Sequence, residues 1–564
     1  MKKIIKLFLG LSIVLYLGSC TKDYLDVNQD PNRPTVPELS QLLSGSQYFM
    51  VQALGQGNFI GTGLSSYTHH LVSREVQNYG MQPGANNPLN TWNYLYTYVL
   101  RDYDAIIEFA EPEGNLIYSG IAKTLKAYAF SMMVDLWGDV PYTEFNVPGL
   151  TSPSPDASED IYNSLISLLE EAAADLSDDE AENALRPSTD DFFYAGNVDS
   201  WTRLNNTIKL KLLLQSRKAK SDITDWQSKL NALISSDSFI NANEGFQFWF
   251  NDVTNPSIER HPAYASLTGQ HTHFISPYFY ETMMGHTHNT TDNPFANIED
   301  PRVPYYFYNQ LPDGARTDTE SPYEYRNGDF VSIFFATTGP NSGGSNDHSY
   351  TKYGIYPVGG KYDDGEGGRI ATSDLPTGIA PHKMITYASL KFMLAELALA
   401  GETTGDVRTL LSEAVNAAID HVHSVVDANG SVNPAPKISN DDRGDFVDAI
   451  LARYDSADDE GKMRILMTQK WIHNFMNPVD VYTDYRRTGY PLLFDASKTQ
   501  APGFGVNLVV TDRSDPTVPL SNFASFPRSL YYPTNSETEL NPNMNQKSNL
   551  STPFVFWDKK KKKK

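Results

Sequence analysis

The stretch IAKTLKAYAFSMMVDLWGDVPYTEF, residues 121–145, decides the fold of this chain. In its first half, apolar side chains recur at spacings of three and four residues, which places them on one face of an α-helix. These positions are Ile121, Leu125, Tyr128, Met132 and Leu136. The alanines between them are small enough for a neighbouring helix to approach closely. The pattern therefore predicts a central, buried helix.

The sequence also indicates where this helix ends. Gly138 follows Trp137 directly, and glycine can adopt the left-handed conformation that commonly closes a helix C-terminus. Pro141 has no amide hydrogen to donate and cannot continue the helix. We therefore expect the helix to stop at Gly138 and the chain to turn through an ordered corner.

The N-terminal residues 1–19 have the organisation of a lipoprotein signal peptide. Lysines precede an apolar run, residues 7–17, that is too short to span a bilayer. Cys20 follows small residues and is the only cysteine, so it cannot form an intramolecular disulfide and is best explained as an acylation site. Residues 20–37 are then expected to form a lipidated tether that holds the protein at a membrane.

The composition excludes some classes of partner. The formal net charge is -23, and a chain this acidic is repelled by the phosphates of nucleic acid. The 33 tyrosines, 28 phenylalanines and 7 tryptophans provide ample core and also flat ring faces on which a sugar could stack. A hydrophobic fraction of 40% with strongly periodic segments excludes disorder for most of the chain. These features suit a folded body exposed to the surrounding medium.

Helical periodicity divides the remaining chain into regions. Residues 38–245 are predicted to be helical. Residues 246–380 are rich in Gly, Pro, Asn, Asp and aromatic side chains and lack a helical period, so we expect a loop-rich, aromatic-rich insert that carries short strands. Helices are expected to resume at Pro381 and to fill residues 381–558, and residues 559–564 form a solvated lysine tail. The predicted fold class is mainly α.

Several motifs resemble those of the SusD/RagB family, whose members are nutrient-binding outer-membrane lipoproteins. They occur in the family's order over nearly the whole mature chain: DLWGDVPY at 135–142, DPR at 300–302, QKW at 469–471, DYRRTGYP at 484–491 and FWD at 556–558. The resemblance, to the SusD-like subgroup, implies a tetratricopeptide-like helical superhelix. It also implies that the corner motif is structural, so Asp135 and Asp139 are not interpreted as catalytic.

The resemblance implies a non-catalytic role at the cell surface. Such a protein is lipid-anchored in the outer membrane, faces the cell exterior, captures an oligosaccharide and delivers it to a SusC-like TonB-dependent outer-membrane transporter. A peptide ligand is an alternative within the same family, and an adhesive lipoprotein is a third possibility. A surface glycoside hydrolase is disfavoured, because no pair of carboxylates is marked for that chemistry.

Two segments supply candidate ligand-binding residues. The polar-aromatic connection 67–92 is longer than a simple loop, and long connections are usually functional. The resemblance places the ligand pocket where the insert meets the N-terminal helices. Aromatic faces would stack on sugar rings and polar side chains would bond to their hydroxyl groups. The predicted ligand-binding residues are Trp92, Tyr79, His69, His70, Arg74, Gln77, Tyr278, Tyr280 and Tyr305.

Other polar clusters favour structural roles. The pairs His271/His273 and His286/His288 have a spacing that suits metal ligation on a strand, but exposed loop histidines are the favoured interpretation. The turn 363–368 offers oxygen donors that suit calcium, yet a plain turn is favoured there, so no cofactor is predicted. Glu396 is interpreted as a carboxylate with a structural partner. Arg486 and Arg487 are interpreted as structurally paired with acidic side chains, and an anion clamp is the alternative for these two arginines.

Overall fold

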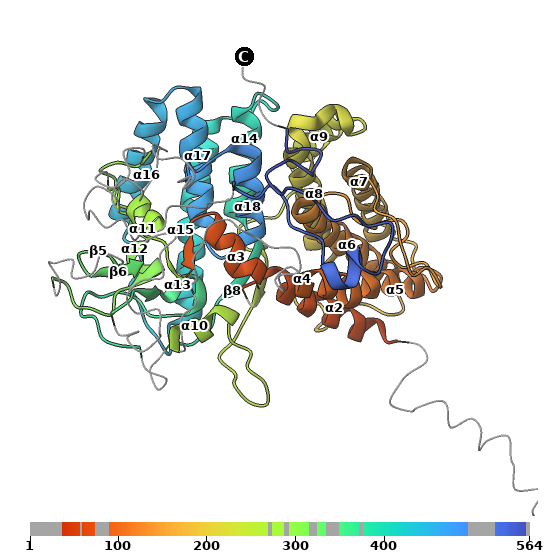
Figure 1. The fold of residues 1–564 in the computed structure, drawn as a ribbon, viewed down its shortest axis with the longest axis horizontal. Coiled ribbons are helices and arrows are strands. Elements are labelled where there is room, and N and C mark those ends of the chain that lie inside the picture. Colours follow the sequence, from red (N-terminus) through yellow and green to blue (C-terminus); the bar gives the residue numbers. More distant parts are fainter. Residues whose placement is uncertain are drawn as a thin grey trace, which may run out of the picture.

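A computed structural model of the chain describes residues 37–56, 59–73, 89–268, 273–286, 293–314, 324–333, 349–370, 376–493 and 525–559. Two helical lobes lie side by side, and the loops and short strands of the insert pack below the second lobe (Figure 1). The mainly α prediction is confirmed. Within these described ranges, no helix is long and apolar enough to cross a membrane.

The first lobe is built around α6, Leu116–Trp137, which is buried along nearly its whole length. Helix α6 packs against α5, α7 and α8. The other helical elements of this lobe are α2 (Leu39–Leu54), α4 (Leu89–Tyr94), the π-helix η2 (Leu95–Leu100), α5 (Arg101–Ala110), α7 (Ser158–Leu176), α8 (Val198–Ser216), the 3-10 helix η3 (Arg217–Asp222) and α9 (Trp226–Ser236). Helix α3 (Phe59–Tyr67) follows α2 in the chain but lies against the second lobe. The predicted central helix is therefore confirmed.

The chain turns at the corner after α6 as expected, but Gly138 does not take the left-handed conformation, because its ψ angle is -121°. Gly138 has φ +80° and donates its amide hydrogen to the carbonyl of Val134 at 2.8 Å. A side chain at this position would collide with the carbonyl of Phe554, so the corner and the C-terminal segment 525–559 fit closely together. Trp137 Nε1 donates to the carbonyl of Tyr531 at 3.0 Å. The corner is thus closed by the end of the chain, which runs across the first lobe and includes the π-helix η5, Thr534–Thr538.

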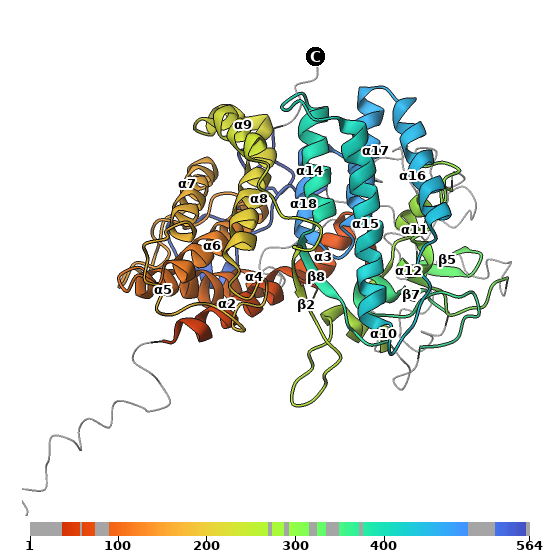
Figure 2. The same cartoon turned by 180° about the vertical axis from the view of Figure 1, so that it is seen from behind.

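The second lobe consists of antiparallel helices: α14 (Tyr387–Leu399), α15 (Val407–Asn429), α16 (Asn440–Asp455), α17 (Asp459–His473) and α18 (Pro478–Thr488). Seen from behind, α14 stands beside α8 of the first lobe, which joins the lobes (Figure 2). On the other side of the joint, α3 packs against α18.

The expected helix start at Pro381 is wrong. Residues Pro381–Ile385 form strand β8, which pairs antiparallel with β2, Phe246–Trp249. The helix begins only at Tyr387, where the hydroxyl of Thr386 accepts the amide hydrogen of Ser389 at 3.1 Å and caps the first turn. Pairing with a strand far away in the sequence overrides the local helical pattern.

The insert contains loops and short strands, as predicted. Its strands and short helices are β3 (His273–Ile275), β4 (Phe307–Tyr308), β5 (Glu324–Asn327), β6 (Phe330–Ile333), β7 (Lys352–Tyr353), η4 (Pro262–Tyr264), α10 (Ala265–Thr268), α11 (Pro277–Met283), α12 (Val303–Tyr306) and α13 (Ile355–Val358). With β1 (Leu71–Ser73), the strands form antiparallel pairs β1–β3, β2–β8, β4–β7 and β5–β6. Strand β2 and the loop that follows it form one wall of the candidate site.

Candidate ligand-binding site

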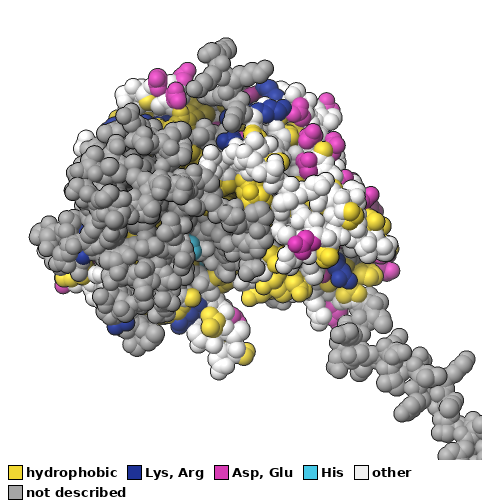
Figure 3. Space-filling model, in the orientation of Figure 1, with side chains coloured by type: hydrophobic (Ala, Val, Ile, Leu, Met, Phe, Trp, Pro, Cys, Tyr) yellow, Lys and Arg dark blue, Asp and Glu magenta, His cyan; other side chains and the backbone are white. Residues whose placement is uncertain are grey.

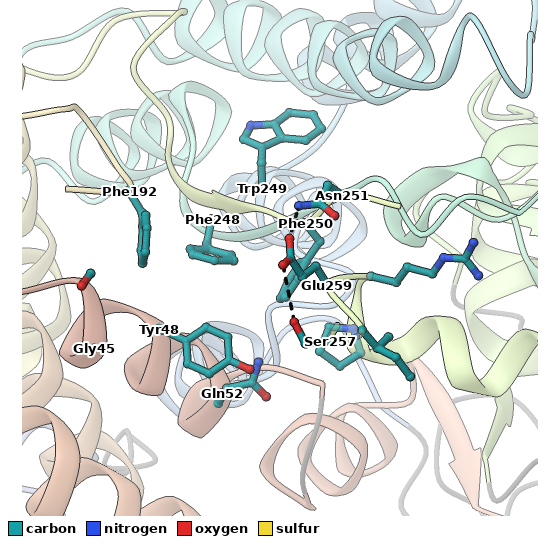
Figure 4. Close-up of a pocket in the computed structure, with 14 residues that line it drawn as sticks. Gly45, Tyr48, Gln52, Phe192, Phe248, Trp249, Phe250, Asn251, Ser257 and Glu259 are labelled. Carbon is teal, nitrogen blue, oxygen red and sulfur yellow. Dashed lines mark hydrogen bonds between the residues drawn. The ribbon is translucent and has the colours of Figure 1, made fainter. Parts of the chain in front are cut away.

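A pocket of about 930 Å³ opens where α2 faces β2 and the loop after it (Figure 4). Helix α2 contributes one wall through Tyr48 and Gln52. The loop before α8 contributes Phe192, and residues 248–251 with 257–262 supply most of the other wall. Its volume lies in the range typical of small-molecule sites.

Large aromatic side chains line this pocket without being buried. The exposed fractions are 43% for Tyr48, 45% for Phe192 and 38% for Trp249. Phe248 lies between the first two, with ring centroids 6.4 Å from Tyr48 and 5.6 Å from Phe192, and Figure 4 shows these rings around the same opening. Soluble proteins seldom gather exposed apolar side chains in this way unless the surface binds something.

The loop 250–261 is held together by its own hydrogen bonds. Asn251 Nδ2 donates to Glu259 Oε2 at 2.6 Å, and the amide of Asn251 donates to the carbonyl of Glu259 at 3.0 Å. Two backbone bonds attach the loop to the body, from Phe250 to the carbonyl of Ala380 and from His261 to the carbonyl of Gly378. The loop projects below the molecule in Figure 1, and its residues 257–260 line the pocket.

The surface around the pocket differs from the rest of this face. Figure 3 shows hydrophobic side chains on the projecting loop and along the lower edge of the first lobe, whereas Asp and Glu side chains gather on the upper and outer edges of that lobe. On the loop, Ile258 is 75% exposed. An apolar surface with a few polar groups is suited to bind a ligand that has both kinds of surface.

Trp92, the first of the predicted ligand-binding residues, lies elsewhere. Its ring is buried, and its Nε1 donates to Glu537 Oε1 at 2.8 Å. It contacts Trp137 edge to face at a centroid distance of 5.1 Å and borders a separate pocket of about 310 Å³ that Arg101 also lines. The structure therefore places Trp92 beside the corner motif.

The structure brings His69, His70 and Tyr278 together in the interior. His70 stacks on Trp471 with ring centroids 4.5 Å apart, and Tyr278 lies 6.0 Å from the ring of His69. Burial lowers the pKa of His69 to about 3 and that of His70 well below its usual value. Both histidines are therefore neutral at physiological pH.

Tyr280 and Tyr305, the remaining predicted residues that the structure describes, do not line the pocket either. Tyr280 is buried and stacks on Phe330 at 3.9 Å. Tyr305 donates its hydroxyl hydrogen to the carbonyl of Pro436 at 2.7 Å beside a shallow pocket of about 680 Å³. Three predicted ligand-binding residues lie outside the described residues: Tyr79, Arg74 and Gln77. The predicted lipidation site, Cys20, also lies outside them. The predicted ligand-binding roles stay predictions.

An aromatic run in β2 is a feature of the sequence that indicates an exposed aromatic residue at the pocket. Residues 246–250 read Phe-Gln-Phe-Trp-Phe, and successive side chains of a strand point to opposite faces. Three consecutive aromatic residues therefore cannot all enter one core. Trp249 is the one that faces outward.

The charged clusters are structural. Arg487 pairs with Glu396 and Asp484 in the interior, which confirms the interpretation of Arg487 and Glu396 as paired charges. Arg486 differs from the expectation, because it donates to the backbone carbonyls of Asp135 and Arg528 rather than to acidic side chains. Buried carbonyls at the corner supply these acceptors.

The corner acids are structural as well. Tyr162 donates its hydroxyl hydrogen to Asp135 Oδ1 at 2.6 Å, and Trp557 Nε1 donates to the same oxygen at 3.1 Å. Asp139 Oδ1 accepts the amide hydrogen of Ser158 at 2.8 Å, at the start of α7. Both carboxylates are thus used to join elements of the first lobe.

The metal candidates have other partners in the described part of the chain. His286 Nδ1 lies 2.7 Å from Asn327 Nδ2 and 3.2 Å from Glu281 Oε2. Asp363 accepts the amide hydrogens of Asn309 and Gly365, both at 3.2 Å. Within the described ranges no three His, Cys, Asp or Glu side chains gather as a metal site, while His271 and His288 lie outside those ranges.

Known proteins share this architecture. The SusD-like family model described as "Starch-binding associating with outer membrane" matches residues 31–513. No curated protein sequence matches significantly. A SusD homologue from Bacteroides fragilis NCTC 9343 superposes with a TM-score of 0.65 at 16% identity, covering 93% of this chain and 100% of that chain.

Two further solved structures are similar over most of their length. A chitin-binding SusD homologue from Flavobacterium johnsoniae has a TM-score of 0.61 at 18% identity and covers 92% of this chain and 98% of its own. A SusD/RagB family protein from Bacteroides thetaiotaomicron VPI-5482 has a TM-score of 0.61 at 20% identity and covers 93% and 99%. At these identities the likeness establishes the fold.

Proposed function

The chain belongs to the SusD/RagB family, and on that premise we propose that it is a cell-surface protein that captures an oligosaccharide in the pocket between α2 and β2. Proteins of this family are typically binding proteins rather than enzymes, and the family description associates them with the outer membrane. The captured glycan is then passed to a SusC-like TonB-dependent barrel in that membrane. Lipid on Cys20 keeps the protein at the cell exterior.

The exposed aromatic rings of Tyr48, Phe192 and Trp249 carry this proposal. One face of a pyranose ring consists of C–H groups, and such a face packs well on an aromatic ring. The hydroxyl groups at the edge of the sugar need hydrogen-bond partners, which amide and carboxylate side chains such as Asn251 and Glu259 provide. A pocket of about 930 Å³ has room for a short oligosaccharide.

Hydrolysis of the glycan is not supported by the residues that line the pocket. Glycoside hydrolases hold two carboxyl groups on either side of the scissile bond. Among the described lining residues, Glu259 is the one carboxylate, and its Oε2 accepts a hydrogen bond from Asn251. The proposed role is therefore capture without chemistry.

A binding panel tests the proposal. We expect the full-length chain, purified in mild detergent, to bind one class of oligosaccharide with a Kd between micromolar and millimolar in isothermal titration, and to bind no oligopeptide of the same panel. We also expect no new reducing ends after prolonged incubation. Binding of peptides alone would overturn the glycan assignment, and sustained release of reducing ends would overturn the non-catalytic one.

The transporter partner is tested separately. Because delivery requires contact with a barrel, an affinity-tagged chain should co-purify a large outer-membrane protein from its native membranes. Recovery of the chain alone under several mild detergents would count against delivery. That result would not bear on glycan capture, which the isothermal titration tests.

A further inference from the structure

At the edge of the proposed glycan pocket, Arg260 is a cation that has no acidic partner among the described residues. It lines the pocket, and no described carboxylate lies within ion-pair distance of its guanidinium group. Its Nε is buried and has no hydrogen-bond partner in the part of the chain that the structure describes. Several other arginines on the surface have acidic partners, for example Arg408, which contacts Asp455 at 3.1 Å, and Arg443, which contacts Asp420 at 2.8 Å.

The side chain of Arg260 is held in place before any ligand binds. Its guanidinium carbon lies 4.5 Å from the ring centroid of Tyr264, a cation–π contact. Its aliphatic stem packs on Gly378, where an added Cβ would lie 2.7 Å from the Cβ of Arg260 and 2.9 Å from its Cγ. A side chain that is already ordered loses little conformational entropy on binding, so its hydrogen bonds contribute more to affinity.

The pocket is electrically balanced although the chain is strongly acidic. Arg260 and Glu259 are the charged side chains among the described lining residues, and the chain as a whole carries a net charge of -23. The acceptor capacity of Glu259 is partly used by Asn251 Nδ2, at 2.6 Å. Most of the surface of this acidic chain repels an anion, whereas the pocket has no net charge and contains the guanidinium group of Arg260, which can bind one.

We propose that the glycan bound in this pocket carries an anionic group, a carboxylate or a sulfate ester, which Arg260 binds. The planar guanidinium fork donates two parallel hydrogen bonds to either group. The aromatic rings of the same pocket bind the faces of the sugar units, so the inference rests on the proposed function. It adds a charge requirement that a purely aromatic site lacks.

The test compares charged glycans with their charge-neutralised forms. Oligogalacturonides are titrated against their methyl esters, and carrageenan oligosaccharides against their desulfated forms, with the full-length chain in mild detergent. We expect one charged form to bind at least about tenfold tighter than its neutral form. Which pair shows the preference distinguishes carboxylate from sulfate. Raising the salt from about 50 to about 500 mM should weaken the charged form selectively.

Three variants assign the effect to the side chain. Arg260→Gln should lose the preference for the charged form while keeping the affinity for the neutral form, which also shows that the variant is folded. Arg260→Lys keeps the charge but lacks the fork and should keep part of the preference. Arg408→Gln, which changes an exposed arginine of α15, should behave like the wild type.

The outcomes separate this inference from the proposed function. Equal affinity for charged and neutral forms would overturn the inference and leave glycan capture intact. A preference that survives in Arg260→Gln would also overturn it, because another group would then bind the anion. If neither form of these two glycans bound while another, neutral glycan of the panel did, the inference would be overturned and glycan capture would stand.

Discussion

Glu396 shows at the level of one residue how this fold tolerates buried charge. It is fully buried in α14, and Arg487 donates to both of its oxygens, with Nη2 2.7 Å from Oε2. Arg487 also contacts Asp484 at 2.7 Å, and Lys470 contacts Asp484 at 2.8 Å. Burial alone would raise the pKa of Glu396, but the charge and hydrogen bonds of Arg487 lower it from 4.5 to about 2.

The depressed pKa makes stability depend on pH in one direction. Above pH 4.5, where the unfolded chain is also ionised, the stabilisation by Glu396 is fully present, and it is lost as the pH falls toward about 2. We expect Glu396→Gln to lower the free energy of unfolding at pH 7 by about 3–5 kcal/mol, because Arg487 and Lys470 then share Asp484 as their acidic partner and one buried positive charge is uncompensated. Chemical denaturation between pH 7 and pH 3 measures both effects.

The control for this prediction is a surface carboxylate. Glu413 is 44% exposed and contacts Lys391 at 2.8 Å, so Glu413→Gln should change stability by less than about 1 kcal/mol. The wild type and Glu413→Gln should lose stability in parallel as the pH falls, and Glu396→Gln should lose less. Three parallel curves would contradict the assigned role of Glu396.

At the scale of elements, the corner after α6 joins the central helix to the end of the chain. Gly138 has φ +80°, and a side chain there would collide with the carbonyl of Phe554. Gly489 has a similar φ, +84°, but nothing lies within 4 Å of its added Cβ. Gly489 is left-handed with ψ 9°, whereas Gly138 has ψ -121°, so Gly138 differs from Gly489 both in its backbone conformation and in its contact with the C-terminal segment.

This difference gives a paired prediction. Gly489→Ala should cost about 1–2 kcal/mol, the strain of a left-handed alanine. Gly138→Ala should cost at least about 3 kcal/mol, because the segment around Phe554 must also move. Denaturant titration measures both losses, and limited proteolysis should cut the C-terminal segment faster in Gly138→Ala alone. Equal losses in the two variants would mean that the corner does not hold the end of the chain.

Secondary structure that is determined by neighbouring residues could be predicted from the sequence. Secondary structure that depends on contacts with residues far away in the sequence could not. The apolar period of residues 121–136 predicts α6 because the helix is encoded in its own side chains. Residues 381–385 were assigned to a helix wrongly because their partner strand lies at residues 246–249. The π-helical turn of residues 95–100 was also missed, because a run of six residues cannot separate that period from the α-helical one.

At the scale of the whole molecule, the candidate pocket is assembled from segments that are distant in sequence. Tyr48, Phe192 and Phe248 come into contact only after α2, the loop before α8 and β2 have packed. In the sequence, each of these aromatic residues looks like a core residue, because exposure depends on what covers a side chain in the folded state. The predicted residue Trp92 is in fact covered by such neighbours. The family and its fold could therefore be predicted from motifs, whereas the aromatic run at residues 246–250 indicates only one wall of the pocket.

The central claim is that the exposed aromatic rings of this pocket bind the sugar. The decisive measurement is isothermal titration of the preferred oligosaccharide into Trp249→Ala, Phe192→Ala and the control Phe109→Ala, an aromatic residue of α5 that is 36% exposed and does not line this pocket. We predict that each pocket variant loses about tenfold in affinity, because one stacking contact is removed, while the control binds like the wild type. Unchanged affinity in both pocket variants would contradict the account.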